Sequence, residues 1–155
     1  MTPYADTNFF TAALASVEHT AKALALMEKL RVMRGPALPV TPLVRMELTN
    51  ALLRLVHEAR HGNQGIRATP EQMLIAEHTF LEELECGIVW EKSSLSLDAL
   101  ESRFDDIAHR QTARHGFRTY DILHVASALV LGCDTFWSFD LKAQKLAKLE
   151  GLRTN

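Results

Sequence analysis

The chain has 155 residues, of which 47% are hydrophobic and 23% charged, and its formal net charge at pH 7 is −2. These are ordinary values for one globular domain, and the small negative charge excludes a uniformly basic nucleic-acid coat while leaving room for a local basic groove. The longest nearly apolar run, residues 122–133, is too short to span a bilayer and contains His124, so we expect no membrane segment.

The first predicted element is a short strand at residues 4–5, followed by a turn at Asp6 and Thr7 where a helix begins. Asp6 has two interpretations at this point: it caps that helix, or it belongs to a site. Apolar periodicity then predicts a helix over residues 17–33, which ends before Pro36 because proline interrupts a helix.

A second strand is predicted at residues 37–40, followed by a helix over residues 42–60. Thr41 and Pro42 have the residue types of an N-cap and a first helical position. Glu47 lies at the edge of the apolar stripe near the start of this helix. Its simplest interpretation is an acid favoured by the helix dipole, an effect of about 0.3–1 kcal/mol.

In the middle of the chain, residue composition predicts a loop over residues 61–69, and a capping signature predicts a helix over residues 70–85. A short buried strand is expected at residues 88–90. A further helix is expected from residue 96 or 98 to residue 114. Its predicted inner stripe consists of Leu97, Leu100, Phe104, Ile107 and Ala108.

The most informative segment spans residues 118–140. Thr119 is predicted to cap a largely buried helix that ends at Gly132, where glycine can take the left-handed conformation. An aromatic strand over residues 135–139 then leads to Asp140. A basic helix over residues 141–150 and an edge strand in the last five residues complete the chain.

Short strands alternate with helices, and no repeat or linker divides the sequence. This order predicts a single α/β domain over residues 1–155 with mainly parallel pairing. Ligands bind such sheets beyond the C-terminal ends of their strands. Asp6 and Asp140 follow predicted strands, and Glu47 and Asp121 lie near the starts of helices, so we expect all four acids to meet at one edge.

Four converging acids require compensation. Two carboxylates about 5 Å apart repel by roughly 3 kcal/mol at an effective dielectric constant near 20. A hard divalent cation with oxygen ligands is the natural counter-charge. We therefore expect a metal site, and at least one acid with a raised pKa when the metal is absent.

The ordered acids resemble those of PIN-domain nucleases. The resemblance rests on Asp6-Thr7-Asn8, on Glu47 in a helix after the second strand, and on residues 120–140 with their alanine-rich helix, glycine turn and final strand. It covers essentially the whole chain, and the size and arrangement resemble VapC-type toxins of bacterial toxin–antitoxin pairs. It implies a PIN-like three-layer sandwich, with a short-stranded, mainly parallel central sheet between helices.

The resemblance also implies chemical roles. Asp6, Glu47, Asp121 and Asp140 would form a catalytic pocket for Mg²⁺ or Mn²⁺, with Asp6 and Asp121 as direct ligands and the others binding directly or through water. Thr7, Asn8 and Ser138 would orient carboxylates, water or phosphate. The implied reaction is endonucleolytic hydrolysis of RNA to a 5′-phosphate and a 3′-hydroxyl, by a toxin that an antitoxin protein holds inactive. The resemblance further implies a homodimer.

Positive charge for RNA binding is expected elsewhere. Arg103, Arg110 and Arg114 recur at helical spacing, and Arg118 continues the series, so these four are candidate phosphate ligands. An ordinary solvated stripe is the alternative interpretation. His124 is interpreted as a packed helix residue, with a supporting role next to Asp121 left open.

Two other functions remain open: a housekeeping RNA-processing nuclease, and a PIN-fold binding module that has lost cleavage. Cys86 and Cys133 lie in apolar contexts, which favours reduced thiols in a cytoplasmic protein. The N-terminus lacks a basic segment followed by an apolar one, so we expect no signal peptide.

Overall fold

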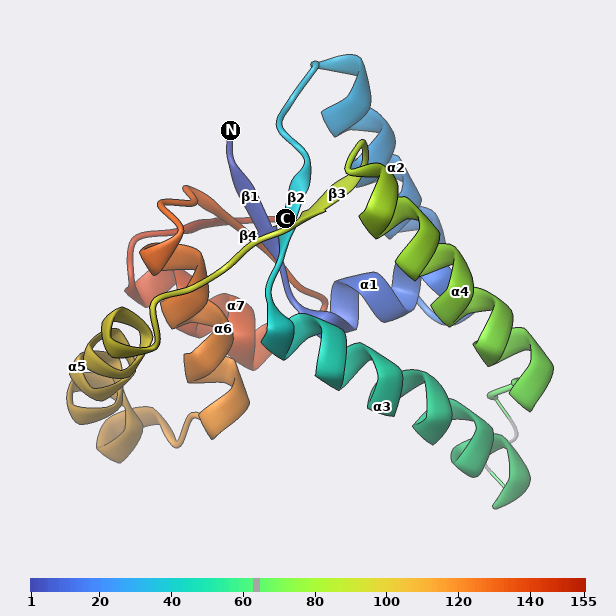
Figure 1. The fold of residues 1–155 in the computed structure, drawn as a ribbon. Helices are drawn as coiled ribbons and strands as arrows, with labels where there is room; N and C mark the ends of the chain where they lie inside the picture. Colours follow the sequence, from blue (N-terminus) through green and yellow to red (C-terminus); the bar gives the residue numbers. More distant parts are fainter. Residues whose placement is uncertain (63–64) are drawn as a thin grey trace.

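The computed structural model describes residues 1–62 and 65–155, and it places short strands between two groups of helices (Figure 1). The helices are α1 (Thr7–Leu14), α2 (Thr20–Val32), α3 (Pro42–Arg60), α4 (Pro70–Cys86), α5 (Leu97–His115), α6 (Thr119–Val130) and α7 (Leu141–Leu149). The strands are β1 (Pro3–Ala5), β2 (Leu38–Val40), β3 (Trp90–Lys92), β4 (Thr135–Trp137) and β5 (Arg153–Thr154). The loop expected over residues 61–69 includes 63 and 64, which lie outside the described residues.

All the strand pairs in the described chain are parallel. One sheet has the order β1-β4-β5 and the other consists of β2 and β3. Tyr4 is paired with Phe136 in the first sheet, and Leu38 with Trp90 in the second. β1 also lies beside β2, so the two sheets form one central layer. The predicted α/β sandwich with a short-stranded parallel sheet is confirmed.

The helices form a layer on each side of the strands (Figure 1). α1 packs against α2 and α3, and α3 packs against α4, whereas α5, α6 and α7 pack together on the other side. The buried rings of Phe9 and Phe10 link these parts. Phe9 lies 5.2 Å from Trp137 on β4, and Phe10 lies 5.7 Å from Trp90 on β3, between ring centroids. Aromatic packing of this kind fixes α1 over the sheet.

Local capping chemistry sets most helix starts. The Thr41 hydroxyl accepts a hydrogen bond from the Val44 backbone N–H, directly before Pro42. Thr69 and Gln72 form a reciprocal capping box at the start of α4. Gly132 has a φ of 69°, as expected for a glycine that ends a helix. The final edge strand is confirmed as β5, which pairs with β4.

Two predicted helix boundaries were wrong. The predicted helix 17–33 begins only at Thr20, because His19 adopts a left-handed backbone and the Thr20 hydroxyl bonds to the preceding turn. Its buried face carries Ala23 and Leu30. Thr119 is the first residue of α6, and Arg118, rather than Thr119, is its N-cap.

The strand predicted at residues 88–90 was also displaced. α4 continues to Cys86, and the pairing with β2 begins at Trp90, so Ile88 is left 79% exposed. The aromatic strand predicted over residues 135–139 ends at Trp137. Leu97, which was expected in the inner stripe of α5, is 74% exposed because it is the first residue of that helix.

Both cysteines are free, but their surroundings differ from the expectation. Cys86 is exposed at the end of α4, and Cys133 is partly buried. Burial, followed by the charge of Asp134, raises the pKa of the Cys133 thiol to about 11. No helix within the described residues combines the length and the apolar character needed to cross a membrane.

Candidate active site

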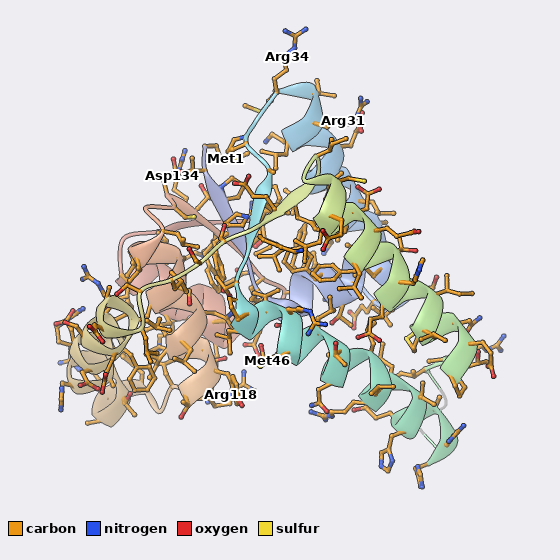
Figure 2. All side chains as sticks on the ribbon, viewed as in Figure 1. Met1, Arg31, Arg34, Met46, Arg118 and Asp134 are labelled. Carbon is orange, nitrogen blue, oxygen red and sulfur yellow. The ribbon has the colours of Figure 1, made fainter. Side chains whose placement is uncertain are left out.

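Four acidic side chains from separate parts of the chain line one pocket of ≈ 700 Å³. β1 and β4 are parallel neighbours, so Asp6 and Asp140, which follow them, lie at the same end of the sheet. α3 and α6 contribute Glu47 and Asp121. In Figure 2 this end of the strands carries Arg118, whereas Met1 and Asp134 lie at the other end. The structure thus brings together all four acids that the sequence singled out.

Asp6 both caps α1 and lines the pocket. Its Oδ1 accepts a hydrogen bond from the Phe9 backbone N–H at 3.0 Å, and only 5% of the residue is exposed. Burial raises the pKa of Asp6 to about 6, although the imidazole of His124, the hydroxyl of Ser138 and the Phe9 N–H lower it. The expectation of a raised pKa at one acid is therefore confirmed.

Glu47 is held by hydrogen bonds from two other helices. The Thr7 hydroxyl donates to Oε2 at 2.7 Å, and Nε2 of His124 lies 2.5 Å from the same oxygen. Burial raises the pKa of Glu47. These two bonds and the nearby charges of His124 and Arg118 lower the pKa by a larger amount, so the net shift is downward. Contacts with α1 and α6 therefore fix this side chain, beyond any effect of the helix dipole.

His124 is buried, as predicted for a packed helix residue, and it also contacts the acidic site. Its Nδ1 lies 2.9 Å from the hydroxyl of Tyr4, a residue with no exposed surface. Burial strongly raises the pKa of Tyr4, so the phenol stays protonated. The other ring nitrogen of His124 faces Glu47. Tyr4, His124 and Glu47 thus form one hydrogen-bonded chain.

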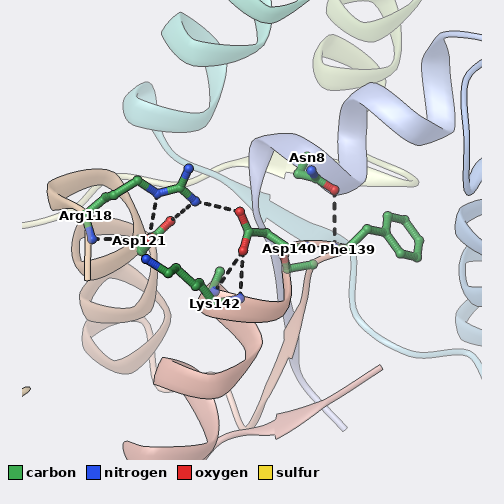
Figure 3. A network of polar contacts seen from close by, with 8 residues as sticks. Asn8, Arg118, Asp121, Phe139, Asp140 and Lys142 are labelled. Atoms are coloured by element: carbon green, nitrogen blue, oxygen red, sulfur yellow. Dashed lines mark hydrogen bonds and ion pairs between the residues drawn. The ribbon is translucent and has the colours of Figure 1, made fainter. Parts of the chain in front are cut away.

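Arg118 joins the remaining two acids (Figure 3). Its Nε and Nη2 each lie 3.0 Å from a different oxygen of Asp121, and Nη2 also donates to Oδ2 of Asp140 at 2.6 Å. Asp140 caps α7 by accepting from the Lys142 N–H at 2.7 Å. Burial raises the pKa of Asp140. The Arg118 bond and the backbone N–H groups at the start of α7 lower the pKa by a larger amount, so the net shift is downward.

The three predicted supporting residues all lie beside these acids. Thr7 donates to Glu47, as described above. Oδ1 of Asn8 accepts from the backbone N–H of Phe139 at 3.2 Å, and the fully buried Ser138 hydroxyl accepts from the Asp140 N–H at 2.9 Å. These contacts fix the backbone that presents Asp140. Their chemical roles remain a prediction.

The arginine series does not converge on the pocket. Arg118 lines it, but Arg103, Arg110 and Arg114 do not. Arg110 forms two bonds each with Asp106 and Glu150, and Arg103 lies 3.7 Å from Asp106. Most of the predicted basic face is therefore engaged with its own acids.

The donor chemistry of the pocket fits a hard divalent cation, but the side chains are arranged around an arginine. The pocket offers carboxylate oxygens, which Mg²⁺ and Mn²⁺ prefer. However, among residues 1–62 and 65–155 no three His, Cys, Asp or Glu side chains are close enough to hold a metal ion as they stand. The guanidinium of Arg118 supplies positive charge between Asp121 and Asp140 instead. Its side chain is 61% exposed, so it has room to move outward.

Sequence reasoning missed two contacts. Arg118 was a candidate for RNA, whereas the structure pairs it with Asp121 and Asp140. The spacing of Arg118 and Asp121, three residues apart at a helix start, was a usable signal for the first pair. No comparable signal exists for His124 and Glu47, which are separated by 77 positions.

Comparison of the sequence with known families gives one match. The family described as PIN domain matches residues 4–149 of the chain. A search among curated proteins found no match.

Solved structures of three bacterial proteins have a similar fold along nearly their whole length. VapBC2 from Rickettsia felis, solved bound to a promoter DNA fragment, has a TM-score of 0.67 at 15% identity, covering 100% of this chain and 98% of that one. VapC20 from Mycobacterium tuberculosis, described as a Sarcin-Ricin loop cleaving toxin, has a TM-score of 0.62 at 15% identity, covering 97% and 96%. FitAcB from Neisseria gonorrhoeae has a TM-score of 0.58 at 13% identity, covering 98% and 95%. At these identities the likeness establishes the fold.

Proposed function

Because this chain belongs to the PIN domain family, we propose that it is a Mg²⁺- or Mn²⁺-dependent endoribonuclease and the toxin of a VapBC-like toxin–antitoxin pair. One observation carries the proposal: Asp6, Glu47, Asp121 and Asp140, from four distant segments, line a single pocket at the C-terminal end of the strands. A folded protein gathers repelling carboxylates in this way only with compensation.

Asp6 and Asp121 are the proposed direct metal ligands, because both are buried at the pocket. Asp140 and Glu47 would complete the site directly or through water. A bound divalent ion would supply a Lewis acid for the phosphodiester and lower the pKa of a water molecule. Glu47, held by Thr7 and His124, is placed to accept a proton or orient that water.

Arg118 has two roles in this proposal. Without metal, its guanidinium neutralises Asp121 and Asp140. When a cation takes over that charge, the largely exposed arginine is free to turn toward a phosphate, which its planar fork can bind through two hydrogen bonds. Arg103 and Arg114 are more distant candidates for the same strand of RNA, whereas Arg110 is engaged with Asp106 and Glu150.

The partners follow from the same premise. The resemblance to VapC-type toxins of toxin–antitoxin pairs, and the similar folds of VapC20, described as a toxin, and of VapBC2, support an antitoxin protein as partner. A homodimer and a cytoplasmic location complete the proposal.

A cleavage assay tests the nuclease. Purified protein is mixed with end-labelled single-stranded RNA in Mn²⁺, in Mg²⁺ and in EDTA, and the products are separated by electrophoresis. We expect metal-dependent cleavage that disappears in Asp6→Asn and Asp121→Asn. Asp105→Asn, which alters an exposed acid on α5, is the matched control and should cut normally. Metal-dependent cleavage that survives both pocket substitutions would contradict the assigned site.

Growth assays test the toxin. Expression of the wild-type chain should arrest growth, co-expression of the neighbouring gene should relieve it, and Asp121→Asn should abolish it. Growth arrest that persists in Asp121→Asn would contradict a nuclease toxin. Cleavage without growth arrest would favour a housekeeping RNA-processing enzyme.

One observation favours a second candidate, a PIN-fold binding module without cleavage. Arg118 already satisfies Asp121 and Asp140, so the folded chain does not depend on a metal for charge balance. Absence of cleavage of any RNA, together with no stabilisation by Mn²⁺, would support this candidate over the nuclease.

A further inference from the structure

The acidic pocket has an aromatic wall. His19 and Phe139 line the same pocket as the four acids. Their rings stack, with centroids 4.7 Å apart and planes inclined by 26°. Phe139 in turn stacks on the fully buried ring of Phe9 at 5.9 Å. The wall is therefore anchored in the core at one end and reaches the pocket at the other.

The backbone of His19 is in a conformation that few residues other than glycine adopt. Its φ of 73° is left-handed, a region in which asparagine, aspartate and histidine are the commonest non-glycine residues. His19 is the N-cap of α2, yet its side chain makes no capping hydrogen bond. Unfavourable backbone conformations of this kind are concentrated at ligand sites. Oε1 of Glu18 lies 3.7 Å from Nε2 of the ring, and the Glu18 side chain is 89% exposed.

The aromatic wall is tied to the acids by the chain itself. Phe139 immediately precedes Asp140, and its backbone N–H is held by the Asn8 side chain. In Figure 3 the Phe139 ring extends from Asp140 on the side away from Arg118 and Asp121. A nucleotide whose phosphate meets the acids would therefore have an aromatic surface beside it, while Arg118 lies on the other flank.

We propose that the ring of His19, backed by Phe139, is a nucleobase-binding subsite. It would take the base of an unpaired nucleotide next to the bond that is cut. The inference rests on the proposed nuclease function and adds to it a side chain that contacts the substrate beside the cut. Unpaired bases stack on aromatic side chains, histidine included, whereas bases inside a duplex have no free face. The side chain of His19 is 32% exposed, which leaves ring surface for that contact.

The test separates the stacking surface of the ring from its imidazole nitrogens and from the backbone conformation. His19→Asn removes the ring but suits the left-handed backbone, and His19→Phe keeps a ring without the imidazole nitrogens. His78→Asn is the control, because His78 is exposed on α4 and does not line the pocket. Circular dichroism and thermal melting establish that each variant is folded.

Binding of a fluorescein-labelled single-stranded RNA is measured by anisotropy in Ca²⁺, and KM and kcat for its cleavage are measured in Mn²⁺. His19→Asn should raise Kd and KM roughly 5- to 150-fold, the range for loss of one base–aromatic stack, with a smaller change in kcat. His19→Phe should stay within about threefold of wild type, since a second ring restores the stacking surface. The effect of His19→Asn should vanish on an RNA with an abasic nucleotide at one position beside the cut.

The other outcomes are decisive. If His19→Asn binds and cuts like wild type, the subsite is wrong and the nuclease stands. If His19→Phe is as weak as His19→Asn, the imidazole nitrogens matter rather than stacking, and the proposal fails. An effect of His19→Asn that is equal on every abasic RNA also overturns it. Wild-type protein that neither binds nor cuts any RNA overturns the proposed function itself.

Discussion

Nε2 of His124 lies 2.5 Å from Oε2 of Glu47, although 77 positions separate the two residues in the chain. The other ring nitrogen is occupied by the buried hydroxyl of Tyr4. The imidazole is thus fixed from both sides, and the carboxylate it meets is fixed with it. This contact gives Glu47 a defined orientation before any metal or substrate arrives.

His124→Leu should impair the site without unfolding the protein. Leucine leaves Glu47 without its main hydrogen-bond donor, so the pKa of Glu47 should rise and its orientation should loosen. Residues that support a metal ligand in this way typically contribute about 10- to 100-fold to affinity or activity. We expect a loss of that size in kcat/KM for cleavage, and weaker Mn²⁺ binding by calorimetry.

Two companion variants sharpen this prediction. His124→Gln retains a side-chain N–H that can reach Glu47, and should recover part of the activity. Tyr4→Phe removes only the outer bond of the chain and should lose less than His124→Leu. Wild-type kinetics in His124→Leu would show that Glu47 needs no support from this ring.

Arg118→Gln should destabilise the metal-free protein and increase its response to metal. Asp121 is buried and loses both bonds of its ionic partner, a change that typically costs about 1–3 kcal/mol. For a chain of this size that corresponds to a drop in melting temperature of roughly 2–12 °C. Mn²⁺ should then raise the melting temperature of the variant by more than that of wild type, because no arginine competes for the carboxylates.

Arg31→Gln is a matched control for this experiment. Arg31 makes a comparable two-bond pair with Glu28, but both side chains are exposed on α2, so its loss should have little effect. Equal responses to Mn²⁺ in wild type and Arg118→Gln would mean that the arginine does not occupy the place of a cation.

Asp6→Asn should stabilise the metal-free protein at neutral pH. Asp6 has a pKa of about 6 in the folded chain and a lower, ordinary value when unfolded. The folded state therefore binds more protons between pH 4 and 6, and stability falls as pH rises through that window. The pKa of Asp6 differs by about two between the folded and unfolded states, which corresponds to a destabilisation of about 3 kcal/mol above pH 6. Asparagine removes this destabilisation and can still cap α1.

Urea unfolding in EDTA measures this effect. The free energy of unfolding of Asp6→Asn should exceed that of wild type at pH 7.5, and the two should converge near pH 4. Asp105→Asn should follow wild type at both values. A stabilisation that is the same at both pH values would exclude the ionisation of Asp6 as its cause.

Arg110→Gln should affect stability more than RNA cleavage. Arg110 is bound to Asp106 and to Glu150, whose side chain is only 5% exposed, so its loss leaves a buried carboxylate without its cation. We expect a decrease of about 1–3 kcal/mol in the free energy of unfolding. KM for RNA and its salt dependence should stay within about twofold of wild type.

Arg114→Gln provides the comparison, because this arginine was predicted on the same helix face. If either substitution weakened RNA binding strongly and reduced its salt dependence, α5 would carry phosphate ligands as the sequence first suggested. Unchanged stability in Arg110→Gln would show that Glu150 finds another partner, such as Gln111, which already donates to it at 2.8 Å.

The order of the elements and the convergence of the acids were predictable from the residues alone. Helix starts at Asp6, Thr41 and Thr69 depend on residues only three positions apart, so they are visible locally. The positions of the acids after parallel strands follow from topology, because the ends of such strands meet at one edge. The PIN domain family was likewise evident from Asp6, Glu47 and the segment up to Asp140.

The way in which the charges of those acids are compensated became visible only in the folded chain. The bond between His124 and Glu47, the bridge from Arg118 to Asp140 and the ring of His19 against Phe139 all join residues far apart in the chain. Such contacts depend on side-chain rotamers and on the separation of packed helices, which local propensity does not specify. The exposure of Ile88 has the same origin, because its apolar side chain fits a strand but the register with β2 begins two residues later.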